Sequence, residues 1–210
     1  MSLIQLLRVA SLASAVFCFV FLVFLLVRTN ALGRRKLFSV PRGSAGRGVV
    51  YAFGPGMMPW EKESAGGHLP TFIGGILYHA AIFIAFLYLF WVNLAPASIR
   101  PLRIFRIALF MGAAAGLALF VKRAVKPHLR RLSCPDDFFA NLFVDFYLVI
   151  SLCHTYFPRG EPLLLFSAIA LFMYIPLGKI RHCFFFFYTR ILFGVFFGRR
   201  GVYPCSAPKA

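Results

Sequence analysis

The chain has 210 residues, of which 60% are hydrophobic, 18% are aromatic and only 14% are charged. A soluble domain of this length cannot bury that much apolar surface, and a disordered chain lacks such a share of aromatic residues. The 23 Lys and Arg residues against 6 Asp and Glu give a net charge of +17, but these cations lie in short clusters between long uncharged runs. Basic loops on one side of a membrane account for this charge, so we expect no nucleic-acid partner.

Five mostly apolar runs are long enough to be candidates for crossing the hydrocarbon core of a bilayer. They predict transmembrane helices at about 9–27, 71–92, 107–121, 138–157 and 162–178. A further apolar run at about 183–198 is interrupted by Arg190 and predicts an amphipathic helix in the membrane interface. The expected fold class is therefore an all-α, polytopic bundle, with one transmembrane domain over residues 1–198 and a cytoplasmic tail over 199–210.

The distribution of Lys and Arg predicts the orientation of these helices. The loops after the first and third helices and the C-terminal tail hold 18 of these cations, whereas the opposite side holds 5. The N-terminus is therefore expected outside and the C-terminus inside, in agreement with an odd number of crossings. The first apolar run exceeds the core of ~7–15 residues found in signal peptides, and its stronger basic flank follows it, so we expect a retained helix.

Four histidines lie in or beside the predicted helices, where an ionisable group is costly and by default suggests function. They are His68, His79, His154 and His182, whereas His128 lies among loop cations and is interpreted as a solvated residue. Neutral imidazole is a common axial ligand of haem iron, and a b-type haem needs two such ligands on facing helices. These residue types at these depths make a haem site one of the interpretations that the histidines leave open.

Each histidine also has an interpretation without haem. The small residues around His79 would serve close packing of two helices as well as the approach of a flat macrocycle. His68 follows Gly66 and Gly67 and would be a loop residue near the inner surface. His154 would be an interfacial residue bonded to a carbonyl group, and His182 would be favoured at a helix C-terminus by the helix dipole.

Asp145 lies in the middle of the fourth predicted helix, where a carboxylate must be neutral, paired or exposed to a wet cavity. It would take part in proton transfer from quinol, or it would bind Arg106 or another helix, and we favour the structural role. The five cysteines contain no C-x-x-C pair and therefore lack the spacing of an iron–sulfur or zinc site. No catalytic residue is assigned, because no metal-hydrolase spacing, nucleophile elbow or phosphate-binding loop occurs.

Two motifs resemble a family of membrane cytochromes b. The stretch 75–79 (GILYH) resembles the aromatic–histidine pair early in helix two of that family, and 175–182 (IPLGKIRH) resembles its proline followed six residues later by histidine. The segments 188–190 (YTR) and 193–194 (FG) are similar to the family's inner tail. The family is the γ subunit of respiratory nitrate reductase, with its relatives in heterodisulfide-reductase-like and sulfite-reductase-associated complexes.

The resemblance covers most of the chain and implies that His79 and His182 are axial ligands of one haem b on the inner side. The family's second haem uses another histidine ten residues further along helix two, where this chain has Leu89, and one at the start of helix five, where it has 161–164 (EPLL). A second haem would therefore need His154 and His68 as ligands. We expect one haem, with two as the alternative.

The resemblance also implies a function: a subunit of the inner (cytoplasmic) membrane that exchanges electrons between quinone or quinol and an iron–sulfur partner subunit of a respiratory complex. Alone, such a subunit is not expected to catalyse the reaction of the complex. The basic loops would meet a peripheral partner or anionic lipid. A haem-free membrane anchor of a redox complex is the alternative, and a small transporter with Asp145 as its polar site is the other rival.

Overall fold

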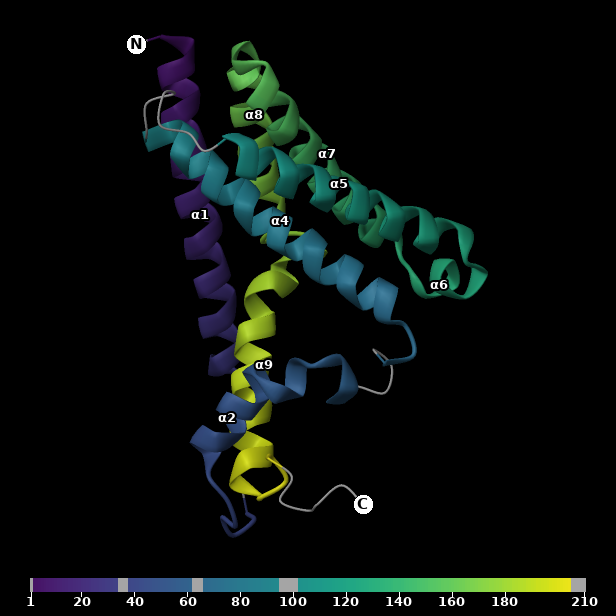
Figure 1. The fold of residues 1–210 in the computed structure, drawn as a ribbon. Helices are drawn as coiled ribbons and strands as arrows, with labels where there is room; N and C mark the ends of the chain where they lie inside the picture. The colour runs from purple at the N-terminus through teal and green to yellow at the C-terminus, as the bar shows by residue number, and fades with distance from the viewer. Residues whose placement is uncertain (1, 34–37, 62–65, 95–101, 205–210) are drawn as a thin grey trace. The chain divides into compact units, whose positions relative to one another are not determined.

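The computed structural model describes residues 2–33, 38–61, 66–94 and 102–204, and its helices are labelled in Figure 1. Within these ranges the chain is helical and contains no strand. The α-helices are α1 (Leu3–Ala31), α2 (Ala45–Phe53), α4 (Leu69–Leu94), α5 (Leu102–Val125), α6 (Pro127–Leu132), α7 (Pro135–Tyr156), α8 (Glu161–Tyr174) and α9 (His182–Arg199). Short 3₁₀ turns are η1 (Pro55–Met57), η2 (Pro59–Glu61), η4 (Pro158–Gly160) and η5 (Lys179–Arg181). Six of the cations used for the orientation lie outside the described residues: Arg34, Arg35, Lys36, Lys62, Arg100 and Lys209.

Five helices are long and apolar enough to cross a membrane, which confirms an all-helical chain of the multi-pass class. They are α1, α4, α5, α7 and the segment Lys179–Arg199, which contains α9. The first four match the first four predicted helices but extend further, because cations and proline continue a helix at its ends without loss of backbone hydrogen bonds.

The fifth candidate helix differs from the prediction. The helical part of the predicted crossing at 162–178 is α8, whose 14 residues span about 21 Å at 1.5 Å per residue, short of a hydrocarbon core of about 30 Å. In contrast, α9 exposes Phe186, Ile191 and Leu192, which point in three different directions around the helix axis. Exposed apolar side chains therefore lie on several sides of α9 rather than on one face, which differs from the pattern expected of an amphipathic interfacial helix.

The chain divides into two compact units, which we call the first unit (Met1–Phe21 and Pro70–Ile180) and the second unit (Leu22–Leu69 and Arg181–Ala210). In the first unit, α8 packs beside α7 (Figure 1). The end of α7 leads through η4 into the start of α8, and the residues that follow α8 return to the start of α7. The segment 161–179 therefore runs the whole length of α7, as a crossing at 162–178 requires, although its last part is a turn.

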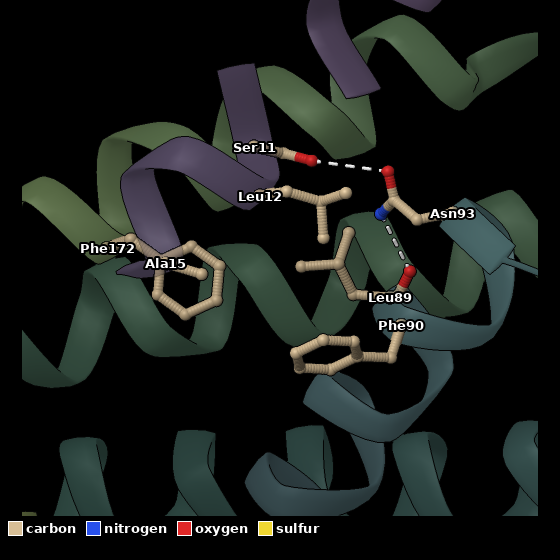
Figure 2. Close-up of a pocket in the computed structure, with 7 residues that line it drawn as sticks. All are labelled: Ser11, Leu12, Ala15, Leu89, Phe90, Asn93 and Phe172. Atoms are coloured by element: carbon tan, nitrogen blue, oxygen red, sulfur yellow. Dashed lines mark hydrogen bonds between the residues drawn. The ribbon is translucent and has the colours of Figure 1, made fainter. Parts of the chain in front are cut away.

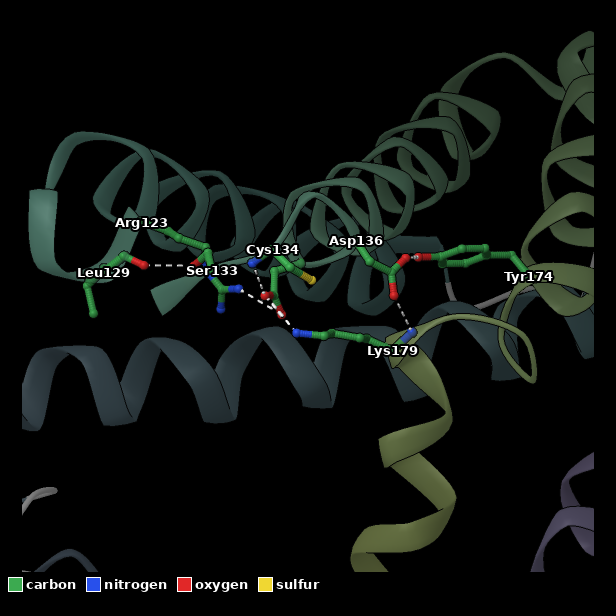
Figure 3. A network of polar contacts seen from close by, with 8 residues as sticks. Arg123, Leu129, Ser133, Cys134, Asp136, Tyr174 and Lys179 are labelled. Carbon is green, nitrogen blue, oxygen red and sulfur yellow. Dashed lines mark hydrogen bonds and ion pairs between the residues drawn. The ribbon is translucent and has the colours of Figure 1, made fainter. Parts of the chain in front are cut away.

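Polar contacts join the helices at both ends of the first unit. At one end, Arg8 Nε lies 2.6 Å from Glu161 Oε1, and Arg106 donates to the hydroxyl and the carbonyl oxygen of Thr155. At the other end, Asp137 accepts from Lys179 Nζ at 2.8 Å and lies 3.4 Å from Arg123 (Figure 3).

The same end holds a second carboxylate beside Asp137. Asp136 accepts from the hydroxyl of Tyr174 and, at 3.0 Å, from the backbone N–H of Lys179 (Figure 3). Together, Asp136 and Asp137 fasten the turn after α8 to the start of α7. Charged groups therefore lie at the two ends of the first unit, which is the arrangement expected of helices that share an apolar layer.

Between these ends, two glycines of α5 allow close approach of the neighbouring helices. A Cβ atom on Gly112 would meet the Cβ of Ala81 in α4, and one on Gly116 would meet Tyr78 of α4 and Asp145 of α7. Gly112 and Gly116 are four residues apart and share one face, the small-residue spacing that lets membrane helices pack tightly.

The second unit contains a comparable crossing of α2 and α9. A Cβ on Gly48 would meet the backbone of Gly194 and Gly198, and the latter are again four residues apart. The N–H groups of Arg42 and Gly43 donate to the carbonyl oxygen of Arg199 at 2.9 and 3.1 Å. The glycines thus allow the segment that begins α2 to lie directly on the backbone of α9.

The glycine contacts predict the stability of two matched variants. Gly112→Ala forces two Cβ atoms together between α4 and α5, and such overpacking costs about 1–3 kcal/mol. Gly74→Ala adds a Cβ that meets no described atom within 4 Å. Its effect on stability is therefore the difference in helix propensity, which favours alanine over glycine by about 1 kcal/mol. In thermal unfolding followed by circular dichroism, we expect G112A to melt below and G74A at or above the unchanged chain. Equal melting temperatures for both variants would contradict the packing described here.

Candidate functional site

His79 is presented on the outer face of α4 in a fixed orientation. Its side chain is exposed among the described residues, and its Nδ1 lies 2.7 Å from the carbonyl oxygen of Gly75. Because a carbonyl oxygen only accepts hydrogen bonds, Nδ1 carries the proton in this contact. In the neutral ring Nε2 then holds the lone pair, and this is the tautomer and second-shell bond typical of metal-ligating histidines.

The backbone beside His79 leaves room for a flat group. Cβ atoms built on Gly74 and Gly75 would meet no described atom within 4 Å. These two glycines therefore do not make the helix–helix contact that was one interpretation of the small residues; Ala81, about two turns further along α4, makes it with Gly112. Gly75 lies one helical turn before His79 on the same face. A macrocycle ligated by His79 could thus approach the α4 backbone.

His154 has a different environment, because it is buried inside the first unit with 2% of its surface exposed. Its Nδ1 is 2.7 Å from the hydroxyl of Tyr88, and the two rings lie 5.7 Å apart. Its Nδ1 therefore contacts a tyrosine hydroxyl where a carbonyl partner was expected, and the interfacial position stays a prediction. Tyr88 is itself 1% exposed, so the pair forms part of the packed interior between α4 and α7.

His182 and His68 both belong to the second unit and are exposed. His182 is the first residue of α9, so the interpretation that a helix C-terminus favours it is wrong. His68 lies in the turn before α4, which confirms the prediction that it precedes the regular helix.

The four predicted ligands are divided between the two units. His79 and His154 share the first unit but lie at different depths, since Tyr88, the partner of His154, is nine residues or about 14 Å beyond His79 along α4. His79 and His182 belong to different units, and their pairing on one haem stays a prediction. No group of three or more metal-ligating side chains occurs among the described residues, but a bis-histidine haem needs only two.

Asp145 belongs to a polar cluster that the sequence indicated only in part. Its Oδ2 accepts a hydrogen bond of 2.8 Å from Asn141, one turn earlier on α7, and Tyr78 of α4 hydrogen-bonds Asn141 at 3.3 Å. The proposed contact with Arg106 is wrong, because Arg106 binds Thr155 at the end of α7. The spacing of four residues between Asn141 and Asp145 was the available signal, whereas nothing in the sequence identified Tyr78.

A small cavity lies between α1, α4 and α8 near the end of the first unit that contains Arg8 (Figure 2). Its volume is about 10 Å³, enough for roughly one water molecule. It is lined by Ser11, Leu12, Ala15, Leu89, Phe90, Asn93 and Phe172. On its polar side, the hydroxyl of Ser11 donates to Asn93 Oδ1 at 3.4 Å. A cavity of this volume is too small for a quinone ring.

The functional assignment depends on these residues and on the family motifs. No protein-family model, no curated protein sequence and no solved structure matches the chain. Of the predicted ligands in the first unit, His79 is exposed and its Nδ1 is bonded to the carbonyl of Gly75, whereas His154 is packed in the interior.

Proposed function

We propose that this chain is the haem b-containing membrane subunit of a respiratory redox complex, and that it passes electrons between membrane quinone or quinol and an iron–sulfur partner. The observation that carries the proposal is the orientation of His79: exposed, held by Gly75 through Nδ1, and beside open backbone at Gly74 and Gly75. A histidine placed only for packing would be covered by neighbouring side chains, as His154 is.

The residues of α4 fit an axial ligand site. The Gly75 carbonyl holds the imidazole of His79 and keeps its proton on Nδ1, and the glycines leave the helix backbone open to a planar group. His182, exposed at the start of α9, would be the second ligand. A haem bound there would supply a one-electron centre between a two-electron quinol and a one-electron iron–sulfur carrier.

His154 and His68 are proposed not to be ligands. His154 is buried and bonded to Tyr88, so a haem could reach it only if the interior of the first unit opened. With His154 engaged in this way, and with Leu89 at the family's other ligand position, the chain favours one haem.

The orientation with the N-terminus outside and the C-terminus inside the inner membrane is part of the proposal, in which 161–179 is the fifth crossing and α9 does not cross the membrane. In the first unit the described cations favour the end proposed to be inside by six to four. They are Lys122, Arg123, Lys126, Arg130, Arg131 and Lys179 at that end, and Arg8, Arg103, Arg106 and Arg159 at the other. The basic inner side would meet the iron–sulfur and catalytic subunits of the complex and anionic lipid.

If His79 and His182 ligate the haem, replacing either of them should cause loss of haem. We expect His79→Ala and His182→Ala each to lower the haem content of the purified chain by roughly tenfold or more, because bis-histidine ligation needs both rings. The measurement is a pyridine haemochrome assay per mole of protein. His128→Ala, at an exposed position on α6, is the matched control and should keep its haem. His154→Phe should also keep its haem; full haem content in H79A would reject the proposed ligand.

Gly75 allows a test that leaves the ligand in place. Gly75→Leu should fold, because its new side chain starts in open space, but it should exclude a macrocycle from the backbone beside His79. We expect a loss of haem of about tenfold, similar to the loss of second-shell support at metal sites. Ala118→Leu, an exposed small residue of α5, is the control for an added leucine. Normal haem content in G75L would show that no group lies against this face.

A further inference from the structure

Asp145 is a carboxyl group in the interior of the first unit, at the midpoint of α7. Only 8% of the residue is exposed. It lies ten residues after Pro135 and eleven before Tyr156, the two ends of its helix, so about 15 Å of helix separates it from either end. Its environment therefore consists of the helices packed around it.

The groups that surround Asp145 are uncharged. Asn141 donates to Oδ2 at 2.8 Å, and the hydroxyl of Tyr78, the titratable group facing it from α4, lies within hydrogen-bonding reach. From α5 it meets Gly116, whose missing side chain leaves the space that Oδ1 and the Tyr78 ring occupy. Oδ1 is buried and makes no hydrogen bond to any described residue.

The charged groups of the neighbouring helices are engaged at the ends of the first unit. On α5, Arg106 binds Thr155, Lys122 binds Thr71 and Arg123 faces Asp137. On α8, Glu161 pairs with Arg8 and Tyr174 donates to Asp136. Of the ion pairs among the described residues, none includes Asp145.

A carboxylate buried without a cation is strongly disfavoured in an apolar interior, whereas a carboxylic acid is tolerated when its oxygens are bonded or shielded. We propose that Asp145 is a proton-binding site inside the first unit: a carboxylic acid that keeps one exchangeable proton at neutral pH. Oδ2 accepts from Asn141, so the proton is carried on Oδ1, in the space beside Gly116. The proposal needs no haem and goes beyond the electron-transfer function.

The composition of the chain makes this site accessible to isotope-edited infrared spectroscopy. The chain has three aspartates, Asp136, Asp137 and Asp145, and the first two bind Lys179, Tyr174 or Arg123 at the end of the unit. The full chain would be produced with ¹³C-labelled aspartate carboxyl groups and placed in lipid nanodiscs at neutral pH. We expect a labelled carbonyl band of a protonated carboxylic acid, equivalent to one residue, that shifts when the buffer is changed to D₂O.

The variants assign this band. Asp145→Asn should abolish the acid band and Asp136→Asn, the matched change on the same helix, should leave it. Only carboxylate bands in the unchanged chain, or an acid band that survives in D145N, would overturn the proposal. If D145N does not fold, Tyr78→Phe provides the second variant: it removes one hydroxyl and should move the acid band, and an unmoved band would overturn the assignment. Because no haem is required, failure here and failure of haem binding are separate results.

Discussion

The absence of water from an apolar bilayer interior is the constraint on which this structure depends. Polar groups on helices that cross such a layer must find partners within the chain. Buried hydroxyls accordingly bond to their own helix: Ser14 donates to the carbonyl of Ser11, Ser151 to that of Tyr147 and Ser167 to that of Leu164. The bond from His79 to Gly75 has the same form, but it has a further effect, since it sets which nitrogen of the ring can ligate a metal.

The same apolar surroundings remove the hydrophobic effect as a force between helices, so close packing and polar contacts take its place. In α5, Gly112 and Gly116 bring the helix against its neighbours, and in α9, Gly194 and Gly198 receive α2. A Cβ built on Gly74 or Gly75, in contrast, would meet no described atom of a neighbouring helix within 4 Å. The glycines of α5 and α9 thus serve packing, whereas the two glycines beside His79 leave open space next to the α4 backbone.

Composition and apolar run length predicted the helical class and the first four long helices, because both depend on sums over about 20 residues. The same sums could not distinguish the segments after α7. Mean hydropathy does not predict where a helix ends, so it missed that α8 ends at Tyr174 and that a turn follows before Lys179. Mean hydropathy also does not show on which sides of a helix the apolar residues lie, so it missed the exposed apolar side chains around α9, which contains Arg190.

The candidate site was predictable to a similar degree. The small residues around His79 drew attention to it in the sequence, whereas the four-residue spacing between Asn141 and Asp145 was a signal that the prediction did not use. The environments of the other histidines depended on tertiary structure: Tyr88 approaches His154 from another helix, and α9 begins at His182, where the end of a helix was expected. Neither the contact of Tyr88 with His154 nor the start of α9 at His182 is indicated by a regular residue spacing in the sequence.

The central claim is that this chain carries haem b, and the most direct measurement is a dithionite-reduced minus oxidised absorption spectrum of the purified chain together with its pyridine haemochrome. The account predicts the α-band of a b-type haem and about one haem per chain, as expected for a single bis-histidine site. A chain of correct fold that contains no haem when isolated from membranes in which haem is abundant would contradict it. The haem-free membrane anchor would then be the better description.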